Sequence, residues 1–213
     1  MTNQPVADFI QLGPDLSLRG TRMHFERDAE IFGEDEPAEY IYCVVSGAVR
    51  TMRFSNDGRR QILGFHLPGD IFGIELGDQH SLTAEALSST DVVMVRRSLL
   101  EKAAAEDPRA SRCWLEHASK TLKAARDHAL ILGRKGAAER VAAFLLEISR
   151  KLMNGCELDL PMSRADIADY LGLTIETVSR SFTEMERQRA IGLPRSRHIV
   201  MRNPLTLAMA AGA

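Results

Sequence analysis

Two charged residues near the end of the chain, Glu176 and Arg180, are four positions apart in a segment with helical periodicity. At this spacing the two side chains stand on one face of a helix. An arginine guanidinium can donate two parallel hydrogen bonds to O6 and N7 of guanine, and a glutamate can accept one from N4 of cytosine. The same pair could instead form a surface ion pair worth about 0.3–0.5 kcal/mol. The elements around the pair favour base reading.

The pair lies in the second of two short predicted helices. Ser163 is a good N-cap with Asp166 at the fourth position of a capping box, and together they predict a first helix over 164–170. Leu171-Gly172-Leu173 predicts a tight turn, where glycine permits a positive φ. Thr174 then caps the second helix. Two helices joined by a glycine-containing turn form a helix-turn-helix, whose second helix presents its N-terminal residues to the major groove.

The second predicted helix is amphipathic and ends near Arg189. Val178, Phe182 and Met185 predict its inward face. Residues 191–195 and 197–201 then predict two short strands, which would form a wing. The candidate phosphate contacts are Thr174, Thr177, Arg187, Arg189, Arg195 and Arg197. Taken individually, each of these arginines is more often an ordinary solvated side chain than a phosphate contact.

A long helix is predicted upstream, from Asp107-Pro108 to Leu132, with Gly133 at its end. Apolar residues recur along it at alternating spacings of three and four, which is a heptad seam. The seam consists of Leu115, Ala118, Leu122, Ala125, Ala129 and Leu132. One interpretation is a two-stranded dimer helix, because alanine allows two backbones to approach closely. The alternative is a helix face packed on its own domain.

The first ~95 residues read as short strands separated by turns. Strands are predicted over 40–46, 48–55, 61–67 and 91–95, and Asp57-Gly58 predicts a hairpin. Many short strands with regular turns indicate a barrel or sandwich. This half contains no paired carboxylates and no nucleophile with a base, so we expect no enzyme. Residues 137–152 predict a further amphipathic helix.

Composition indicates an ordinary globular protein of 213 residues, with 27 basic and 29 acidic side chains. Residues 134–202 contain 12 basic and 9 acidic side chains, so this part is basic and suggests a polyanionic partner. Three widely spaced cysteines argue against a disulfide framework. We find neither a secretory signal nor a run of ~18 apolar residues, and therefore expect a cytoplasmic protein without a membrane partner.

With these motifs in view, the sequence resembles the CRP/FNR family of bacterial transcription regulators, and within it most closely the FixK-type branch. The resemblance rests on Gly64–Gly73, Ala138–Leu145 and Asp166–Arg180, the last being the most specific. It extends over about residues 25–204. The resemblance implies an α+β chain with an N-terminal jelly-roll barrel of the cyclic-nucleotide-binding type, a long dimerisation helix and a C-terminal winged helix-turn-helix.

The expected regions are 1–97 for the barrel, 98–133 for the dimerisation helix and 134–213 for the winged helix-turn-helix. By motif position, the family's base-reading residues fall on Glu176, Ser179 and Arg180. These residues match branches that read a TTGA-type half-site in an inverted repeat. The expected partners are double-stranded DNA, RNA polymerase and a second copy of the chain.

The barrel lacks the groups with which relatives hold a cofactor. Val93 occupies the position of a barrel cysteine that binds an iron–sulfur cluster in the FNR branch. The phosphate-binding segment of the cyclic-nucleotide branch becomes Gly73-Ile74-Glu75, and Leu82 replaces the arginine that would pair with the phosphate. No pair among the six histidines has metal-ligand spacing. We therefore expect neither cofactor nor cyclic nucleotide. Cys156, in a predicted exposed turn, is the candidate for oxidation.

The sequence thus predicts a homodimeric, sequence-specific transcription regulator. The resemblance further implies an activator of genes for low-oxygen respiration or nitrogen fixation, working without a bound cofactor. One alternative is a regulator of the same family gated by haem or another ligand in the barrel. An alternative from a different class is an enzyme with a barrel active site.

Overall fold

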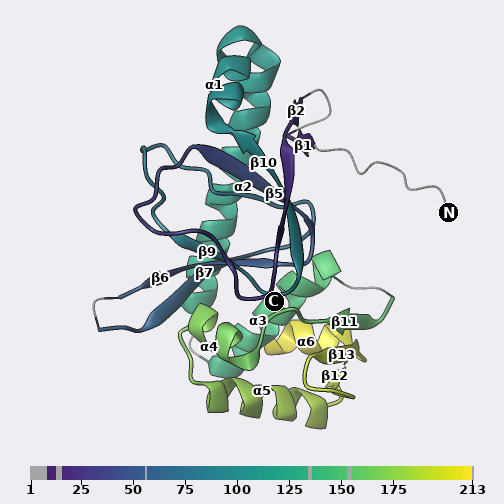
Figure 1. The fold of residues 1–213 in the computed structure, drawn as a ribbon. Coiled ribbons are helices and arrows are strands. Elements are labelled where there is room, and N and C mark those ends of the chain that lie inside the picture. Colours follow the sequence, from purple (N-terminus) through teal and green to yellow (C-terminus); the bar gives the residue numbers. More distant parts are fainter. Residues whose placement is uncertain (1–8, 13–15, 56, 134–135, 153–154, 213) are drawn as a thin grey trace, which may run out of the picture. The chain divides into compact units, whose positions relative to one another are not determined.

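The computed structural model describes residues 9–12, 16–55, 57–133, 136–152 and 155–212 (Figure 1). Within them the chain forms two compact units, each considered by itself. One comprises residues up to Arg53 together with Leu63–Lys123, and the other comprises Phe54–Ile62 together with the residues from Ala124 onward. The three regions expected from the sequence stay a prediction, and residue 134, where the third begins, lies outside the described residues.

Ten strands precede the first helix. They are β1 (Phe9–Gln11), β2 (Ser17–Arg19), β3 (Thr21–Phe25), β4 (Glu30–Phe32), β5 (Tyr40–Ser46), β6 (Val49–Phe54), β7 (Arg60–His66), β8 (Ile71–Phe72), β9 (Thr83–Ala86) and β10 (Thr90–Arg96). Two four-stranded sheets have the orders β3-β10-β5-β8 and β4-β9-β6-β7, and β1 pairs with β2. The predicted strands correspond to β5, β6, β7 and β10, and Gly58 in the predicted hairpin has φ +79°.

The two four-stranded sheets share one apolar core. Phe32 of β4 and Val49 of β6 pack with Tyr42 of β5, Phe72 of β8 and Val92 of β10. Side chains from both sheets therefore meet between them, as in a β-sandwich or jelly roll. The expected α+β class is confirmed. The other six strands, which the sequence analysis did not predict, are only two to five residues long.

The helices follow the local signals closely. They are α1 (Arg97–Glu106), α2 (Pro108–Leu132), α3 (Ala137–Leu152), α4 (Arg164–Leu171), α5 (Ile175–Arg187) and α6 (Pro204–Ala210). The predicted bounds of α2 and α3 are confirmed. α5 ends earlier than expected, since Arg189 has left-handed backbone geometry, with φ +58°. Within the described ranges, each helix is either too short or too polar to span a lipid bilayer.

The C-terminal part holds a three-stranded sheet beside its helices. β11 (Glu157–Asp159), β12 (Ile191–Gly192) and β13 (His198–Met201) pair in the order β11-β13-β12. The predicted wing strands 191–195 and 197–201 were too long, because residues 193–197 form the connection between β12 and β13. Pro194 in that connection has no backbone N–H to donate to a neighbouring strand. α3 packs against both α5 and α6, and α4 packs against α5.

Candidate nucleic-acid interface

The first motif helix, α4, begins with the predicted capping box. Ser163 Oγ accepts from the Asp166 amide at 3.1 Å, and Asp166 Oδ2 accepts from the Ser163 amide at 2.8 Å. The helix ends at Gly172, whose φ of 62° and ψ of 43° are left-handed. Arg140 of α3 donates from Nη1 to the Leu171 carbonyl at 3.1 Å. Both ends of α4 are thus held by local caps, and a guanidinium adds a positive charge at its C-terminus.

The second motif helix, α5, presents one buried face and one exposed face. Val178, Phe182 and Met185 are buried, as predicted. Thr174 caps the helix by accepting from the Thr177 amide at 3.3 Å, and the two threonine hydroxyls lie 3.0 Å apart. α5 packs against α3 and α4 (Figure 1). Because α5 is fixed along its buried face, the exposed residues of its first turns have defined positions.

The residues expected to read bases lie on the exposed face of α5. Glu176, Ser179 and Arg180 are all exposed. Arg180 Nε donates to the backbone carbonyl of Glu176 at 3.4 Å, not to its carboxylate. The Glu176 amide and the Thr174 hydroxyl hold the pKa of the Glu176 carboxyl below its usual range, with a smaller contribution from Arg180. Glu176 is therefore an ionised acceptor, and its carboxylate does not form the surface ion pair considered as the alternative.

Ile175 is a further candidate that the sequence analysis missed. It is the first residue of α5 and is 47% exposed, next to Glu176. An apolar side chain at the start of such a helix can contact a thymine methyl group in the major groove. Its position directly after the N-cap is the signal that could have identified it.

The candidate phosphate contacts differ in their surroundings. Arg187 is paired with Glu184 through two hydrogen bonds of 2.7 and 2.8 Å, so its charge is largely compensated. Arg197 is half-buried and donates from Nη1 to the Pro161 carbonyl at 3.2 Å. Arg195 is exposed in the turn between β12 and β13, and no hydrogen bond or ion pair engages its side chain among the described residues. Arg195 is therefore the most available of the three for a phosphate oxygen.

Arg60 is another residue that the sequence analysis did not connect with the motif. It belongs to the segment 54–62 of the second unit. Its Nε donates to Asp169 Oδ2 at 2.8 Å and its Nη2 to Asp166 Oδ1 at 2.9 Å. Gln61 donates to the Asp169 carbonyl at 2.7 Å. These partners are over a hundred residues away in sequence, and no local pattern links them.

The heptad seam of α2 is open in the single chain. Leu115 is 70% exposed and Leu122 is 52% exposed. Ala118, Ala125 and Ala129 are also exposed, and Leu132 is half-buried. A neighbouring stripe of the same helix packs within the chain instead, through residues that include Ala110, Cys113 and Ile131. The seam is therefore distinct from the face that packs on its own chain.

The segments that would hold a cyclic nucleotide offer no counter-charge for its phosphate. Glu75 accepts hydrogen bonds from the amide and hydroxyl of Ser81, at 3.0 and 2.8 Å. Leu82 is half-buried at the position where the resemblance places arginine. Arg50, on β6, is paired with Glu85. These residues do not fit an anionic phosphodiester, because its charge would be left without a cation.

Aromatic rings occupy the space between the two sheets. The His80 ring stacks on Phe32 with centroids 3.7 Å apart, and Tyr42 stacks on Phe72 at 5.3 Å. His66 adds a further ring 5.0 Å from Phe72. His80 is buried, and burial lowers the pKa of its imidazole. The core between the two four-stranded sheets is therefore packed with aromatic side chains around Phe32 and Phe72.

The residues that could bind a metal ion or be oxidised are dispersed over the described parts of the chain. Across the described ranges, His, Cys, Asp and Glu side chains nowhere gather in a group of three that could hold a metal ion. Val93, where the resemblance places a cluster cysteine, is buried in β10. Burial raises the pKa of Cys43 to about 11, Cys113 is buried, and Cys156 is exposed as expected.

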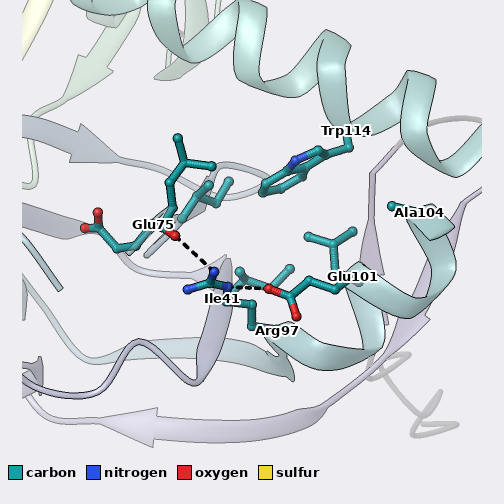
Figure 2. Close-up of a pocket in the computed structure, with 9 residues that line it drawn as sticks. Ile41, Glu75, Arg97, Glu101, Ala104 and Trp114 are labelled. Atoms are coloured by element: carbon teal, nitrogen blue, oxygen red, sulfur yellow. Dashed lines mark hydrogen bonds and ion pairs between the residues drawn. The ribbon is translucent and has the colours of Figure 1, made fainter. Parts of the chain in front are cut away.

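The first unit contains a cavity of about 300 Å³ beside Trp114 (Figure 2). Its apolar walls come from β5, the segment 74–76, α1 and the start of α2. Arg97 lies at its edge and donates from Nε to Glu101 Oε1 at 2.7 Å and from Nη2 to the Leu76 carbonyl at 3.2 Å. Figure 2 shows the Trp114 ring facing this space from α2.

Comparisons with known proteins agree with this architecture. Residues 139–210 match the family model of a Crp-like helix-turn-helix domain, and residues 22–107 match that of a cyclic nucleotide-binding domain. The nitrogen fixation regulation protein FixK of Azorhizobium caulinodans is 47% identical, covering 86% of this chain and 76% of that protein. FixK of Rhizobium meliloti is 41% identical, covering 92% of this chain and 90% of that protein.

A solved structure extends the agreement to three dimensions. The structure of FixK2 from Bradyrhizobium japonicum superposes with a TM-score of 0.89 at 51% identity, covering 92% of this chain and 99% of that one. Both halves of the chain therefore have recognised counterparts in the expected order. The chain belongs to the CRP/FNR family of transcription regulators and, within it, to the FixK branch.

Proposed function

We propose that this protein is a homodimeric transcription activator that recognises an inverted repeat of TTGA-type half-sites. The observation that carries the proposal is the exposed group Glu176, Ser179 and Arg180 on a helix whose cap and buried face are fixed. Hydrogen-bonding groups held rigidly at the start of a recognition helix are what direct readout in the major groove requires.

One G·C pair can satisfy both charged residues. Arg180 donates to O6 and N7 of guanine, while the ionised carboxylate of Glu176 accepts from N4 of the paired cytosine. Ile175 lies beside them and can contact a thymine methyl of the same half-site. On the wing, Arg195 is available for a phosphate oxygen, which would contribute to affinity but not to sequence preference.

The open seam of α2 supports the dimer. A twofold dimer presents two recognition helices, and its half-sites lie about one helical turn apart. Exposed leucines at heptad positions are unfavourable in water, and a second α2 would cover them. The dimer interface we propose consists of Leu115, Ala118, Leu122, Ala125, Ala129 and Leu132.

The physiological role is proposed from relatives. FixK proteins are named for regulation of nitrogen fixation, and AadR of Rhodopseudomonas palustris, 41% identical over 76% of this chain, is named a transcriptional activatory protein. We infer activation of genes for nitrogen fixation or low-oxygen respiration, with RNA polymerase as the protein partner. The poor fit of the barrel to a phosphodiester supports binding to DNA without a cyclic nucleotide.

Selection of bound DNA from a random pool tests the proposal directly. The expected result is an inverted repeat of TTGA-type half-sites, bound by protein purified with reductant and without an effector. Cyclic AMP should change the Kd less than twofold, which is about 0.4 kcal/mol. Selected DNA that contains no inverted repeat, or a tenfold decrease of the Kd on addition of cyclic AMP, would contradict the proposal.

Substitution of Arg180 tests the base assignment. Arg180→Ala should cost about 1–3 kcal/mol per half-site and relax preference at the G·C pair. The measurement is a binding titration against operators varied at that position. Equal loss for every base would make Arg180 a phosphate contact instead.

A second candidate function is favoured by the cavity beside Trp114. A volume of about 300 Å³ with mostly apolar walls is at the small end of ligand pockets. In this case a small apolar effector would gate DNA binding. Trp114 is the one tryptophan of the chain, so its fluorescence reports directly on occupancy. A probe that shifts this fluorescence and changes operator affinity in parallel would favour the gated regulator.

A further inference from the structure

Arg164, the first residue of α4, contacts two other elements of the motif unit at once. Its guanidinium carbon lies 3.1 Å from the ring centroid of Phe182 on α5. Its Nη2 donates to the carbonyl of Ser196 at 3.0 Å, in the turn between β12 and β13. A single side chain therefore joins the first motif helix, the recognition helix and the wing.

The wing turn has few other anchors. Among the described residues, the bond from Arg164 is the one hydrogen bond that reaches residues 194–196. Pro194 has no amide hydrogen to donate. The neighbouring attachments are the Leu193 amide to Glu186 Oε1 at 3.0 Å and Arg197 Nη1 to the Pro161 carbonyl. The position of Arg195, between these attachments, therefore depends strongly on the bond to Ser196.

The arginine itself is held firmly at its other end. Phe182 is 1% exposed, so its ring is fixed in the core and offers one face to the guanidinium. A planar guanidinium can stack on that face and donate within its own plane at the same time. A lysine ammonium carries the same charge but has no plane with which to do both.

The contacts that the structure gives Arg164 orient other groups of the motif unit. Its Nη1 is buried and has no hydrogen-bond partner within the described part of the chain. Burial lowers the pKa of the guanidinium to about 10. The side chain as a whole is half-buried, and its Nη2 donates at the surface, to the carbonyl of Ser196. Its contacts are with the interior face of α5 and with the wing backbone.

We propose that Arg164 is a positioning residue that ties the wing turn to the recognition helix, so that Arg195 and Arg180 engage the same operator together. This inference rests on the proposed DNA-binding function and adds a residue that acts through the wing turn and the recognition helix. Its consequence is that wing contacts are lost when Arg164 is changed, even when the charge at that position is kept.

The test compares full-length Arg164→Lys, Arg195→Ala and the double variant on the selected operator at several salt concentrations. Arg195→Ala should reduce the slope of log K against log salt by about one for each wing. Arg164→Lys should reduce the slope by a similar amount and weaken binding, although it removes no charge. The double variant should lose little beyond either single variant. Preference at the G·C pair should persist in all three.

Arg150→Lys, the same change at an exposed arginine of α3, is the matched control and should leave slope and affinity unchanged. Circular dichroism and thermal melts check folding. If Arg164→Lys unfolds, Phe182→Leu carries the test, because it removes the ring face but keeps an apolar side chain. An unchanged slope in the folded variant, or additive losses in the double variant, would overturn the inference. Wild-type protein that selects no DNA would refute the proposed function instead.

Discussion

Replacement of Leu122 by glutamate is the sharpest perturbation of the proposed dimer. Leu122 lies in the middle of the α2 seam and is 52% exposed in the single chain. The fold of one chain should therefore tolerate the change, since the side chain is not part of its core. A partner helix would place two such carboxylates against each other in an apolar seam. The perturbation thus acts on association and not on folding.

The expected magnitude follows from the exposure of Leu122. A partner covers about half a leucine side chain, and losing that burial costs roughly 1 kcal/mol per protomer. Desolvating two unpaired carboxylates costs a few kcal/mol more. A combined loss of about 5 kcal/mol raises the dimer dissociation constant by a factor of roughly 10³–10⁴. Protein at micromolar concentration should become monomeric and lose operator binding.

Sedimentation velocity at several concentrations measures this directly. Leu130→Glu is the matched control, because Leu130 is 68% exposed on the same helix but lies outside the seam. Leu130→Glu should remain dimeric, and both variants should show unchanged circular dichroism. A Leu122→Glu protein that still sediments as a dimer would show that the seam is not the interface.

Three further predictions follow from local geometry. Gly172→Ala should destabilise the protein by about 1–2 kcal/mol in thermal unfolding, because a φ of 62° strains any residue with a side chain, although the added Cβ has room. The control is Gly77→Ala, where the added Cβ meets open space and the stability should not change. Burial lowers the pKa of His128, which stacks on Tyr170 at 4.0 Å, so the unfolded chain binds its proton more tightly. Stability should be complete above the ordinary pKa of about 6.5 and fall as pH drops below it, and His128→Phe should show a shallower fall in denaturant titrations. Iodoacetamide should modify Cys156, which is exposed, well before it modifies Cys113, which is buried, or Cys43, whose thiol pKa is raised to about 11. Mass spectrometry after timed quenching measures the order of modification, and modification of Cys43 or Cys113 first would contradict the prediction.

Helix positions could be predicted from the sequence because their signals are local. The bounds of α2 and α3 follow from residues within the helices and at their ends. The capping box of Ser163 and the left-handed Gly172 likewise involve partners only a few residues away. The exposed triad Glu176, Ser179 and Arg180 follows from the periodicity of α5, because its buried face is continuous in sequence.

Strands were predicted less completely, since each depends on a partner that sequence does not specify. β3 pairs with β10, although their paired residues lie some seventy positions apart in sequence. The side chains of Arg22 on β3 and Asp91 on β10 also form a hydrogen bond of 2.7 Å. Strands of two to five residues carry too little alternation to be recognised alone. The length of the wing strands depended in the same way on where pairing stops.

By itself, the sequence determined helices α2 to α5, the caps of α4 and α5, the exposed face of α5 and the apolar seam of α2. Only the tertiary structure decided that the seam stays exposed in the single chain while a neighbouring stripe of α2 is buried, and that Arg60 and Arg164 contact parts of the motif unit distant in sequence. The physical reason is the distance along the sequence over which each kind of interaction acts. Backbone caps and helical periodicity act over a few residues, whereas a half-buried guanidinium such as that of Arg60 meets its acceptors only after distant segments have packed together.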